Sequence, residues 1–355
     1  RHVPKWLDKA LDSRPLLGKI AKAQKGSMTA GKEVGAMALS TFQGVDGPLA
    51  KEFRHLVDWA VNKEKPDAIF LSTAMQLGLA PAIKAVSDIP VFCSFQGEDT
   101  FLESLIEPYQ SQVWEVMRTA SSHIERFLAP SEAFFKYMAE RLQIGEERVS
   151  IIPNGINLDG YSPPVDAPTP PKVGFLARLN YLKGLDLLVE AFIILHKTDK
   201  IPLETQLDIA GTTLPDDQKF IDEQITKLDS AGLGQKYRIR QNISREEKIE
   251  HLRGLTVLSV PVRYPEAFGL YTIEAMAAGV PIVQPNHGAF PEIIEHTGGG
   301  ATYNSNNPEA LADALKPWLN DPELSYQTGI HAHHAIKSKY SIKKHAEQIL
   351  KVCFT

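Results

Sequence analysis

Short apolar runs that alternate with amphipathic segments along most of the chain are the feature that most constrains its fold. The first such runs are AIFLS (68–72), VFCSF (91–95), RFLAPS (126–131) and VSIIPN (149–154). Helix-period segments alternate with them, for example at residues 49–63, before the first run, and at 132–142, between the last two. Strands this short and apolar, separated by helices, are typical of a parallel sheet that is covered on both faces. The sequence therefore predicts an α/β protein.

A proline-rich segment at residues 161–172, YSPPVDAPTPPK, marks the best domain boundary, because prolines make a linker stiff. The alternation resumes beyond it, with predicted strands KVGFLARL, QLDIAGTT, YRIRQN, TVLSVPV, PIVQPN and ATYN and predicted helices at 184–197, 216–230, 244–253 and 270–278. We predict two doubly wound parallel-sheet domains, residues 1–165 and 166–335, facing across a cleft, and a C-terminal helix at 336–355 that crosses back to the first domain. Ligands of such sheets bind at the carboxyl ends of the strands.

The composition excludes several classes of protein. The 355 residues carry a net charge of −5, so a nucleic-acid partner is not expected. Two cysteines far apart, Cys93 and Cys353, predict neither a disulfide framework nor a zinc site and fit a reducing cytosol. No apolar run reaches the roughly 18 residues of a membrane span. We expect a cytoplasmic protein, and because Arg1 opens the chain without a methionine, we expect that the start of the natural protein is missing.

The first 25 residues combine basic and apolar side chains, including Trp6, Leu11 and Leu17. Such a segment could hold the protein peripherally at the inner face of an anionic membrane that carries a lipid-linked acceptor. The alternative is a helix that packs on a sheet. The three histidines of HAHHA, His331, His333 and His334, lack a complete set of metal ligands, so we predict a solvated helix and no metal site.

The loop and helix at residues 263–281, RYPEAFGLYTIEAMAAGVP, predict an anion-binding site. Gly269 would let a ligand approach the backbone, and the first amides of a helix starting at Leu270 would face that ligand. Because carboxylates are poor phosphate ligands, we expect Glu266 and Glu274 to bind hydroxyl groups on either side of a diphosphate. The alternative is an ordinary strand–loop–helix unit with stabilising acidic residues.

A second loop, at residues 177–192, places Arg178 and Lys183 after the first strand of the same domain. These cations could clamp a diphosphate, arginine through two parallel hydrogen bonds and lysine as a point charge. The alternative is that both are solvated charges where a helix begins.

Four motifs in order resemble the retaining GT-B glycosyltransferases: RLNYLKG, the Glu266–Glu274 E-x7-E pattern, FGLYTIEAMAAGVPIV and GAFPEII. VSIIPNGINLDGY is similar to the segment between that family's domains. The resemblance implies a GT-B fold of two Rossmann-like domains and transfer of a sugar from a UDP-, GDP- or ADP-sugar to the hydroxyl of a saccharide or a lipid-linked acceptor. It implies no cofactor and no metal.

The resemblance also implies roles for individual residues. The donor would be bound by Arg178, Lys183, Phe268, Gly269, Leu270, Tyr271 and Glu274, with Glu274 on the ribose. Glu266 would contact the donor sugar. Gln96 stands where many members of the family have a histidine, and it can hydrogen-bond but cannot carry charge. Glu98 or Asp99 could orient or deprotonate an acceptor, and the alternative for Asp99 is a helix cap.

One departure is that we find no strand followed by a glycine-rich loop before Glu33, although the family begins with one. Two further functions stay open on the same fold. One is a nucleotide-sugar epimerase or a phosphorylase, and the other is a non-catalytic nucleotide-binding protein. The base, the sugar and the acceptor are not given by the sequence, although YRIRQNIS (237–244) is expected to border the base.

Overall fold

The chain forms two compact units in a computed structural model, which describes residues 30–198 and 200–354. Among the described residues, one unit comprises 30–91 and 98–124, and the other comprises 92–97, 125–198 and 200–354. The membrane contact predicted for residues 1–25 lies outside the described residues.

The first unit is mainly helical. Its elements are α3 (Ala30–Gln43), η2 (Gly44–Asp46), α4 (Ala50–Asp58), η3 (Trp59–Glu64), β1 (Ile69–Leu71), η4 (Ala74–Leu79), α5 (Ala80–Lys84), α6 (Asp99–Glu103) and α7 (Tyr109–Ser121). The side chain of Thr73 caps η4 by accepting a hydrogen bond from the amide of Met75. A threonine here satisfies an amide that would otherwise lack an acceptor, which fixes where the helical turn begins.

A four-stranded sheet runs in the order β1-β2-β3-β4, which is also the chain order. Its other strands are β2 (Val91–Ser94), β3 (Arg126–Ala129) and β4 (Val149–Ile151), which pair in parallel. Helix α8 (Glu132–Leu142) and η5 (Glu146–Arg148) follow β3. The rings of Phe95 and Phe127 stack 4.9 Å apart and are fully buried, so aromatic packing holds β2 to β3.

A six-stranded parallel sheet forms the rest of the second unit, in the order β10-β9-β8-β5-β6-β7. Its elements are β5 (Lys172–Leu176), α9 (Leu185–Lys197), β6 (Gln206–Gly211), η6 (Pro215–Asp217), α10 (Gln218–Ser230), β7 (Tyr237–Gln241), α11 (Arg245–Arg253), β8 (Val257–Leu258), α12 (Leu270–Ala277), β9 (Ile282–Pro285), α13 (Phe290–Thr297), β10 (Gly300–Tyr303) and α14 (Pro308–Asn320). The chain builds this sheet outward from β5, first towards β7 and then, after returning to β8, towards β10. The strand order therefore reverses between β5 and β8, where a doubly wound sheet binds its ligand.

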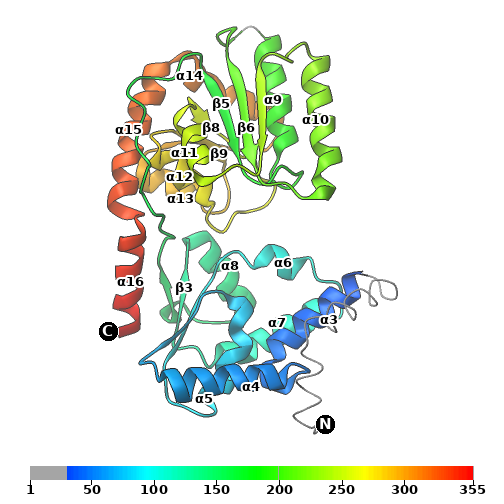
Figure 1. Cartoon of the computed structure of the whole chain (residues 1–355), viewed down its shortest axis with the longest axis vertical. Helices are drawn as coiled ribbons and strands as arrows, with labels where there is room; N and C mark the ends of the chain where they lie inside the picture. Colours follow the sequence, from blue (N-terminus) through cyan, green and yellow to red (C-terminus); the bar gives the residue numbers. More distant parts are fainter. Residues whose placement is uncertain (1–29, 199, 355) are drawn as a thin grey trace. The chain divides into compact units, whose positions relative to one another are not determined.

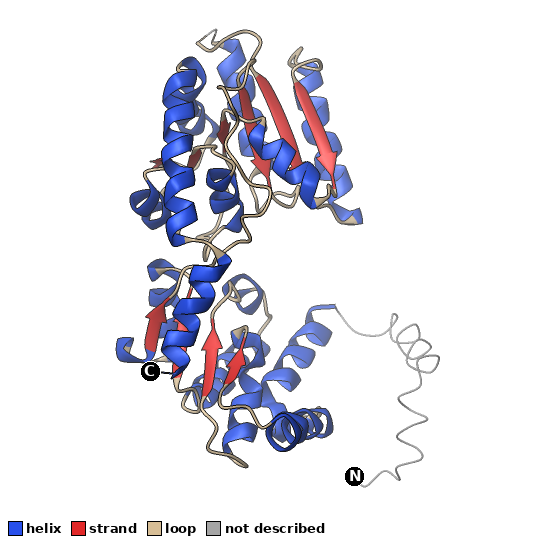
Figure 2. Ribbon diagram, turned by 60° about the vertical axis from the view of Figure 1, so that its left-hand side comes forward, coloured by secondary structure: helices blue, strands red, loops and turns tan. Residues whose placement is uncertain are grey.

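Helices cover both faces of this sheet (Figure 2). Helices α9 and α10 lie side by side next to β5 and β6 (Figure 1). Phe175 of β5 and Leu188 and Phe192 of α9 are fully buried in the common core. The predicted α/β fold with two parallel sheets is confirmed, because apolar strands buried on both faces need helices on both sides.

Glycines set the ends of the helix at the reversal point. Gly269, at φ +80°, is the N-cap of α12, and Gly279, at φ +79°, follows its last turn. Both residues lie in the left-handed region, which a side chain disfavours. The predicted helix at 270–278 is thus confirmed. Strand β8 is shorter than TVLSVPV suggests and ends at Leu258.

Helices α15 (Pro322–Lys339) and α16 (Ile342–Phe354) complete the chain. The amide of Ile342 donates to the carbonyl of Ile156, and the Nδ1 of His345 lies 2.8 Å from the carbonyl oxygen of Pro153. These bonds join the start of α16 to the segment after β4. Over the described ranges, no helix is both long and apolar enough to cross a membrane.

Candidate active site

The loops after β5 and β8 pack directly against each other where the strand order reverses. A Cβ on Gly184, whose φ is +74°, would lie 2.0 Å from the carbonyl oxygen of Pro261, so only glycine fits. The amide of Arg263 donates to the carbonyl of Leu182 over 3.0 Å. The Arg263 guanidinium also forms an ion pair of 2.7 Å with Asp186. The two loops therefore form one rigid surface at the carboxyl ends of the strands.

Lys183 and Glu266, predicted from separate loops, form an ion pair on this surface. The Nζ of Lys183 lies 2.7 Å from Oε2 of Glu266, and the Tyr271 hydroxyl donates to the same oxygen over 3.1 Å. The two side chains of the pair are only 18% and 16% exposed. The Lys183 ammonium also lies 5.0 Å from the centre of the Tyr264 ring. The structure thus surrounds one carboxylate with a cation and a phenol.

This pairing raises the pKa of Lys183. Burial by itself would lower that pKa, but the charge of Glu266 and contacts with Tyr264 outweigh the effect. Burial, together with the nearby Glu266, raises the pKa of the Tyr271 hydroxyl well above its usual range. Lys183 is therefore a stable cation at neutral pH, and Tyr271 stays a neutral hydrogen-bond donor.

The amino end of α12 lies beside this group. The amide and the hydroxyl of Thr272 both donate to the Gly269 carbonyl. The amides of Leu270 and Tyr271 have no acceptor within residues 30–198 and 200–354. The Leu270 side chain is 46% exposed, whereas that of Phe268 is buried and packs towards Tyr340. Two helix-terminal amides next to a lysine can bind an anion, and Phe268 could contribute only through its backbone.

Glu274, one turn into α12, is held by two residues that sequence reasoning missed. Its Oε1 accepts a hydrogen bond from the Tyr161 hydroxyl at 3.3 Å and pairs with Lys248 of α11. Burial, followed by the charge of Glu274, raises the pKa of Tyr161. The position of Lys248 in α11, the helix that follows β7, was a usable signal, whereas nothing in the sequence points from Tyr161 to Glu274.

Arg178 borders a pocket of about 390 Å³ at the carboxyl ends of β5 and β6. The pocket is lined by Leu176, Ala177, Arg178, Gly211, Thr212, Ile243, Ser244, Arg245 and Lys248. The Arg178 guanidinium makes two hydrogen bonds, of 2.9 and 3.0 Å, to the nearly buried Asp217. Hydrogen bonding to Asp217 raises the pKa of Arg178 and lowers that of Asp217. Arg178 thus already has a carboxylate partner, which the sequence did not indicate.

The predicted residues after β2 fall into both units. Gln96 donates to the Ser94 hydroxyl at 2.8 Å, and the next residue, Gly97, lies against Ala267, which follows Glu266. Glu98 is buried in the first unit, where it accepts bonds from the Thr73 hydroxyl and the Ala74 amide. Glu98 therefore stabilises η4. Asp99 is the first residue of α6 rather than its cap, which is Glu98.

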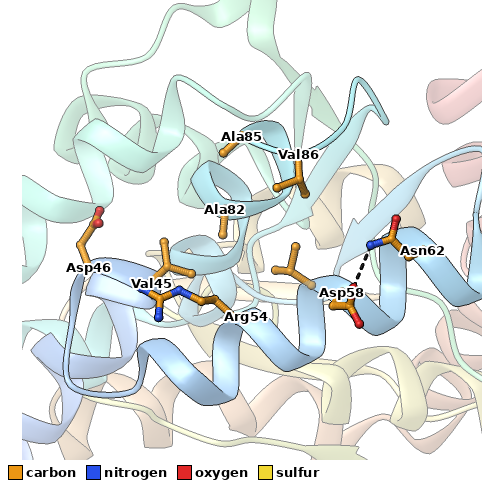
Figure 3. A pocket seen from close by; sticks show the side chains of 9 residues that line it. Val45, Asp46, Arg54, Asp58, Asn62, Ala82, Ala85 and Val86 are labelled. Atoms are coloured by element: carbon orange, nitrogen blue, oxygen red, sulfur yellow. Dashed lines mark hydrogen bonds between the residues drawn. The ribbon is translucent and has the colours of Figure 1, made fainter. Parts of the chain in front are cut away.

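A second pocket, of about 380 Å³, lies in the first unit between η2, α4 and α5 (Figure 3). Val57 and Ala82 line it, and Asp58 and Asn62 of its rim hydrogen-bond to each other over 2.8 Å. None of the predicted site residues lines this pocket. Across the part of the chain that the structure describes, no three His, Cys, Asp or Glu side chains gather closely enough to hold a metal ion.

The fold and the site define a class of protein: an α/β protein of the GT-B type with charged residues at the reversal point of its second sheet. Solved structures with this architecture include Anabaena HepE in complex with UDP, with a TM-score of 0.70 and 18% identity over 84% of this chain and 81% of that one. Sucrose-phosphate synthase from Thermosynechococcus elongatus has a TM-score of 0.68 and 20% identity over 86% of this chain and 78% of that one. These likenesses show the fold.

Family models give the more specific result. Residues 38–159 match the model for Glycosyltransferase Family 4, and residues 163–334 match that for Glycosyl transferases group 1. Together the two models match most of the chain, which therefore belongs to the glycosyltransferases that these two models describe.

Curated proteins also match part of the chain. The lipopolysaccharide core biosynthesis mannosyltransferase LpcC of Rhizobium leguminosarum is 28% identical over 56% of this chain and 58% of that protein. The D-inositol 3-phosphate glycosyltransferase of Streptomyces avermitilis is 27% identical over 63% of this chain and 50% of that protein. The chain spans about half the length of the curated relatives that it matches.

Proposed function

We propose that this protein is a retaining glycosyltransferase that moves a sugar from a nucleoside-diphosphate sugar to an acceptor hydroxyl without a metal ion. The observation that carries the proposal is the arrangement at the reversal point. There, the Lys183–Glu266 pair lies beside the two amides of α12 that have no acceptor among the described residues. A cation and helix-terminal amides match a diphosphate, and the adjacent carboxylate matches sugar hydroxyls.

Each residue of the site takes one role in the proposed reaction. Lys183 and the amides of Leu270 and Tyr271 hold the diphosphate, while Arg178 approaches it from the pocket beyond β5. Glu274 binds ribose hydroxyls, and Glu266 contacts the donor sugar. Gln96 hydrogen-bonds to the sugar from the loop after β2, and Asp99 orients the acceptor.

The proposed transfer breaks the bond between the anomeric carbon and the diphosphate oxygen. Negative charge then develops on the leaving diphosphate, where Lys183 and the helix amides stabilise it electrostatically. The acceptor oxygen attacks the oxocarbenium-like sugar from the face that the diphosphate leaves. The proton of the acceptor hydroxyl passes to an oxygen of the leaving diphosphate. Because the new bond forms on the face from which the old one broke, the configuration at the anomeric carbon is retained.

We propose UDP as the first nucleotide to test, because HepE was solved in complex with UDP and with UDP-glucose. The name of LpcC, a lipopolysaccharide core biosynthesis mannosyltransferase, supports the proposal of a saccharide or a lipid-linked acceptor. We also keep the proposal of a cytoplasmic protein that contacts the inner face of the membrane peripherally.

Calorimetric titration with UDP and GDP, in the presence of a metal chelator, tests the donor site directly. We expect binding of at least one nucleotide with and without chelator. A panel of nucleotide sugars, followed by NMR of the products, then tests the chemistry. A released or transferred sugar whose first-formed anomer matches the donor supports the proposal. An epimerised nucleotide sugar, cleavage that requires phosphate, or binding without any turnover would each replace it with another function.

A further inference from the structure

The backbone carbonyls of Glu266 and Ala267 are each held by a hydrogen bond from a residue outside the donor site. The carbonyl of Glu266 accepts a hydrogen bond from the amide of Ala289 over 3.0 Å. The carbonyl of Ala267 accepts one from the Ser131 hydroxyl over 2.7 Å, and Ser131 is 1% exposed. Two consecutive carbonyls of the loop are therefore fixed by two different segments of the second unit.

The Ser131 hydroxyl accepts one hydrogen bond and donates another. As the N-cap of α8, its oxygen accepts a hydrogen bond from the amide of Phe134 over 3.1 Å. A hydroxyl can accept and donate at once, so its hydrogen remains available for Ala267. A cap alone would need only an acceptor, which asparagine or aspartate also supplies.

The same helix end is tied to α13 by Glu292. Its two carboxylate oxygens accept hydrogen bonds from the amides of Glu132, over 2.9 Å, and Ala133, over 3.3 Å. Glu292 lies three residues after Ala289, whose amide binds the Glu266 carbonyl. The bonds therefore close a ring through the loop, the α8 end and the start of α13.

The ring leaves little freedom for the loop. A Cβ on Gly288 would lie 2.5 Å from both the amide nitrogen and the carbonyl oxygen of Glu266. A Cβ on Gly97 would lie 3.4 Å from that of Ala267. A shift of Ala267 would therefore move the backbone of Glu266. It would also change the contact between Ala267 and Gly97, which follows Gln96.

We propose that Ser131 is a positioning residue, which sets the Glu266 carboxylate for catalysis by donating to the Ala267 carbonyl. This inference rests on the proposed function of Glu266, whereas the ring of hydrogen bonds is observed independently of that function. Ser131→Ala removes the donor and the cap together, and Ser131→Asn restores both an acceptor and a donor. Asn307→Ala is the matched control, because Asn307 caps α14 through the amide of Ala310 and its other hydrogen bonds are to Ser305 and Leu311.

Donor hydrolysis and nucleotide binding are measured on the four proteins, together with amide hydrogen exchange of residues 264–272. We expect Ser131→Ala to lower kcat by about 10- to 100-fold, because small displacements of a reacting group carry that cost. The nucleotide Kd should change less than about twofold. Amide exchange of residues 264–272 should be faster in Ser131→Ala than in the wild type. Ser131→Asn should recover much of the wild-type kcat and of the slow exchange. Asn307→Ala should leave both kcat and this exchange unchanged.

Two results would overturn the inference. The first is a wild-type kcat together with unchanged amide exchange in Ser131→Ala. The second is a loss of kcat in Asn307→Ala as large as that in Ser131→Ala, which would mean that both variants act through a general loss of stability. A wild-type protein that binds no nucleotide and turns over no donor would refute the proposed function instead. Exchange in 264–272 would then decide alone whether Ser131 holds the loop.

Discussion

The two parallel sheets differ in how their strand order follows the chain. The four-stranded sheet runs β1-β2-β3-β4 in chain order, whereas the six-stranded sheet reverses between β5 and β8. Each sheet has a glutamate in a loop that follows a strand, Glu98 after β2 and Glu266 after β8. Glu98 satisfies the start of η4, and Glu266 pairs with Lys183 from the other side of the reversal.

The strand order decides where a carboxylate can reach a ligand. At a reversal, the chain leaves neighbouring strands in opposite directions, so a crevice opens between their loops. Where consecutive strands lie next to each other, the following loop can fold back on its own unit, as Glu98 does on Thr73. A glutamate after a strand is therefore not by itself a sign of a site.

Removing Lys183 should have the largest effect on ligand binding. In Lys183→Ala, the diphosphate loses its cation and Glu266 is left partly buried without one. We expect the nucleotide Kd to rise about 10- to 100-fold, because a charge-assisted hydrogen bond contributes roughly 1.5–3 kcal/mol. Calorimetric titration measures the change, with the exposed Lys197→Ala as the control. Unchanged affinity would mean that the reversal point is not the donor site.

Altering Glu274 tests how far the site extends along α12. Glu274→Gln keeps an acceptor for the Tyr161 hydroxyl but loses the charge that pairs with Lys248. We expect the Kd for a nucleoside diphosphate to rise about tenfold, since hydrogen bonds to ribose become weaker without the charge. Binding of inorganic pyrophosphate should change much less. Equal losses for both ligands would contradict a ribose role.

Truncating Glu98 tests whether the glutamate of the four-stranded sheet has a structural role. Glu98→Ala leaves the Thr73 hydroxyl and the Ala74 amide without their acceptor in a buried position. We expect the free energy of unfolding to fall by about 1–3 kcal/mol. Denaturant unfolding provides the measurement, and the exposed Glu103→Ala is the control. Nucleotide affinity should stay at the wild-type level, and a stable variant with weakened binding would show that the two glutamates do not differ in role.

The smallest effect concerns the loop before α13. Burial lowers the pKa of His287, despite opposing contributions from the Val262 backbone and Glu266. A group with a lowered folded pKa binds its proton more readily in the unfolded chain, so stability is lost as the pH falls below about 6.5. We expect the wild-type Tm to fall more than that of His287→Gln between pH 7 and pH 5.5. Parallel Tm curves would contradict this contribution.

The sequence alone predicts the order of strands and helices in the second sheet and the glycines that start and end α12. Apolar alternation and glycine φ preferences act over a few residues, so they can be read locally. It also placed Lys183, Glu266 and Gly269 in strand-end loops, which a doubly wound sheet brings to one edge. Parallel strands ending together make that inference possible without knowing any contact.

The pairing of polar and charged groups could be found only from the three-dimensional packing. Arg178 pairs with Asp217, Lys248 pairs with Glu274, and Ser131 donates to Ala267, across sequence separations that no local pattern encodes. The choice of partner depends on how loops from different strands pack, and burial then makes each pairing obligatory, because an unpaired buried charge or polar group costs free energy. For the same reason, the role of Glu98 became clear only when Thr73 and Ala74 were found against it.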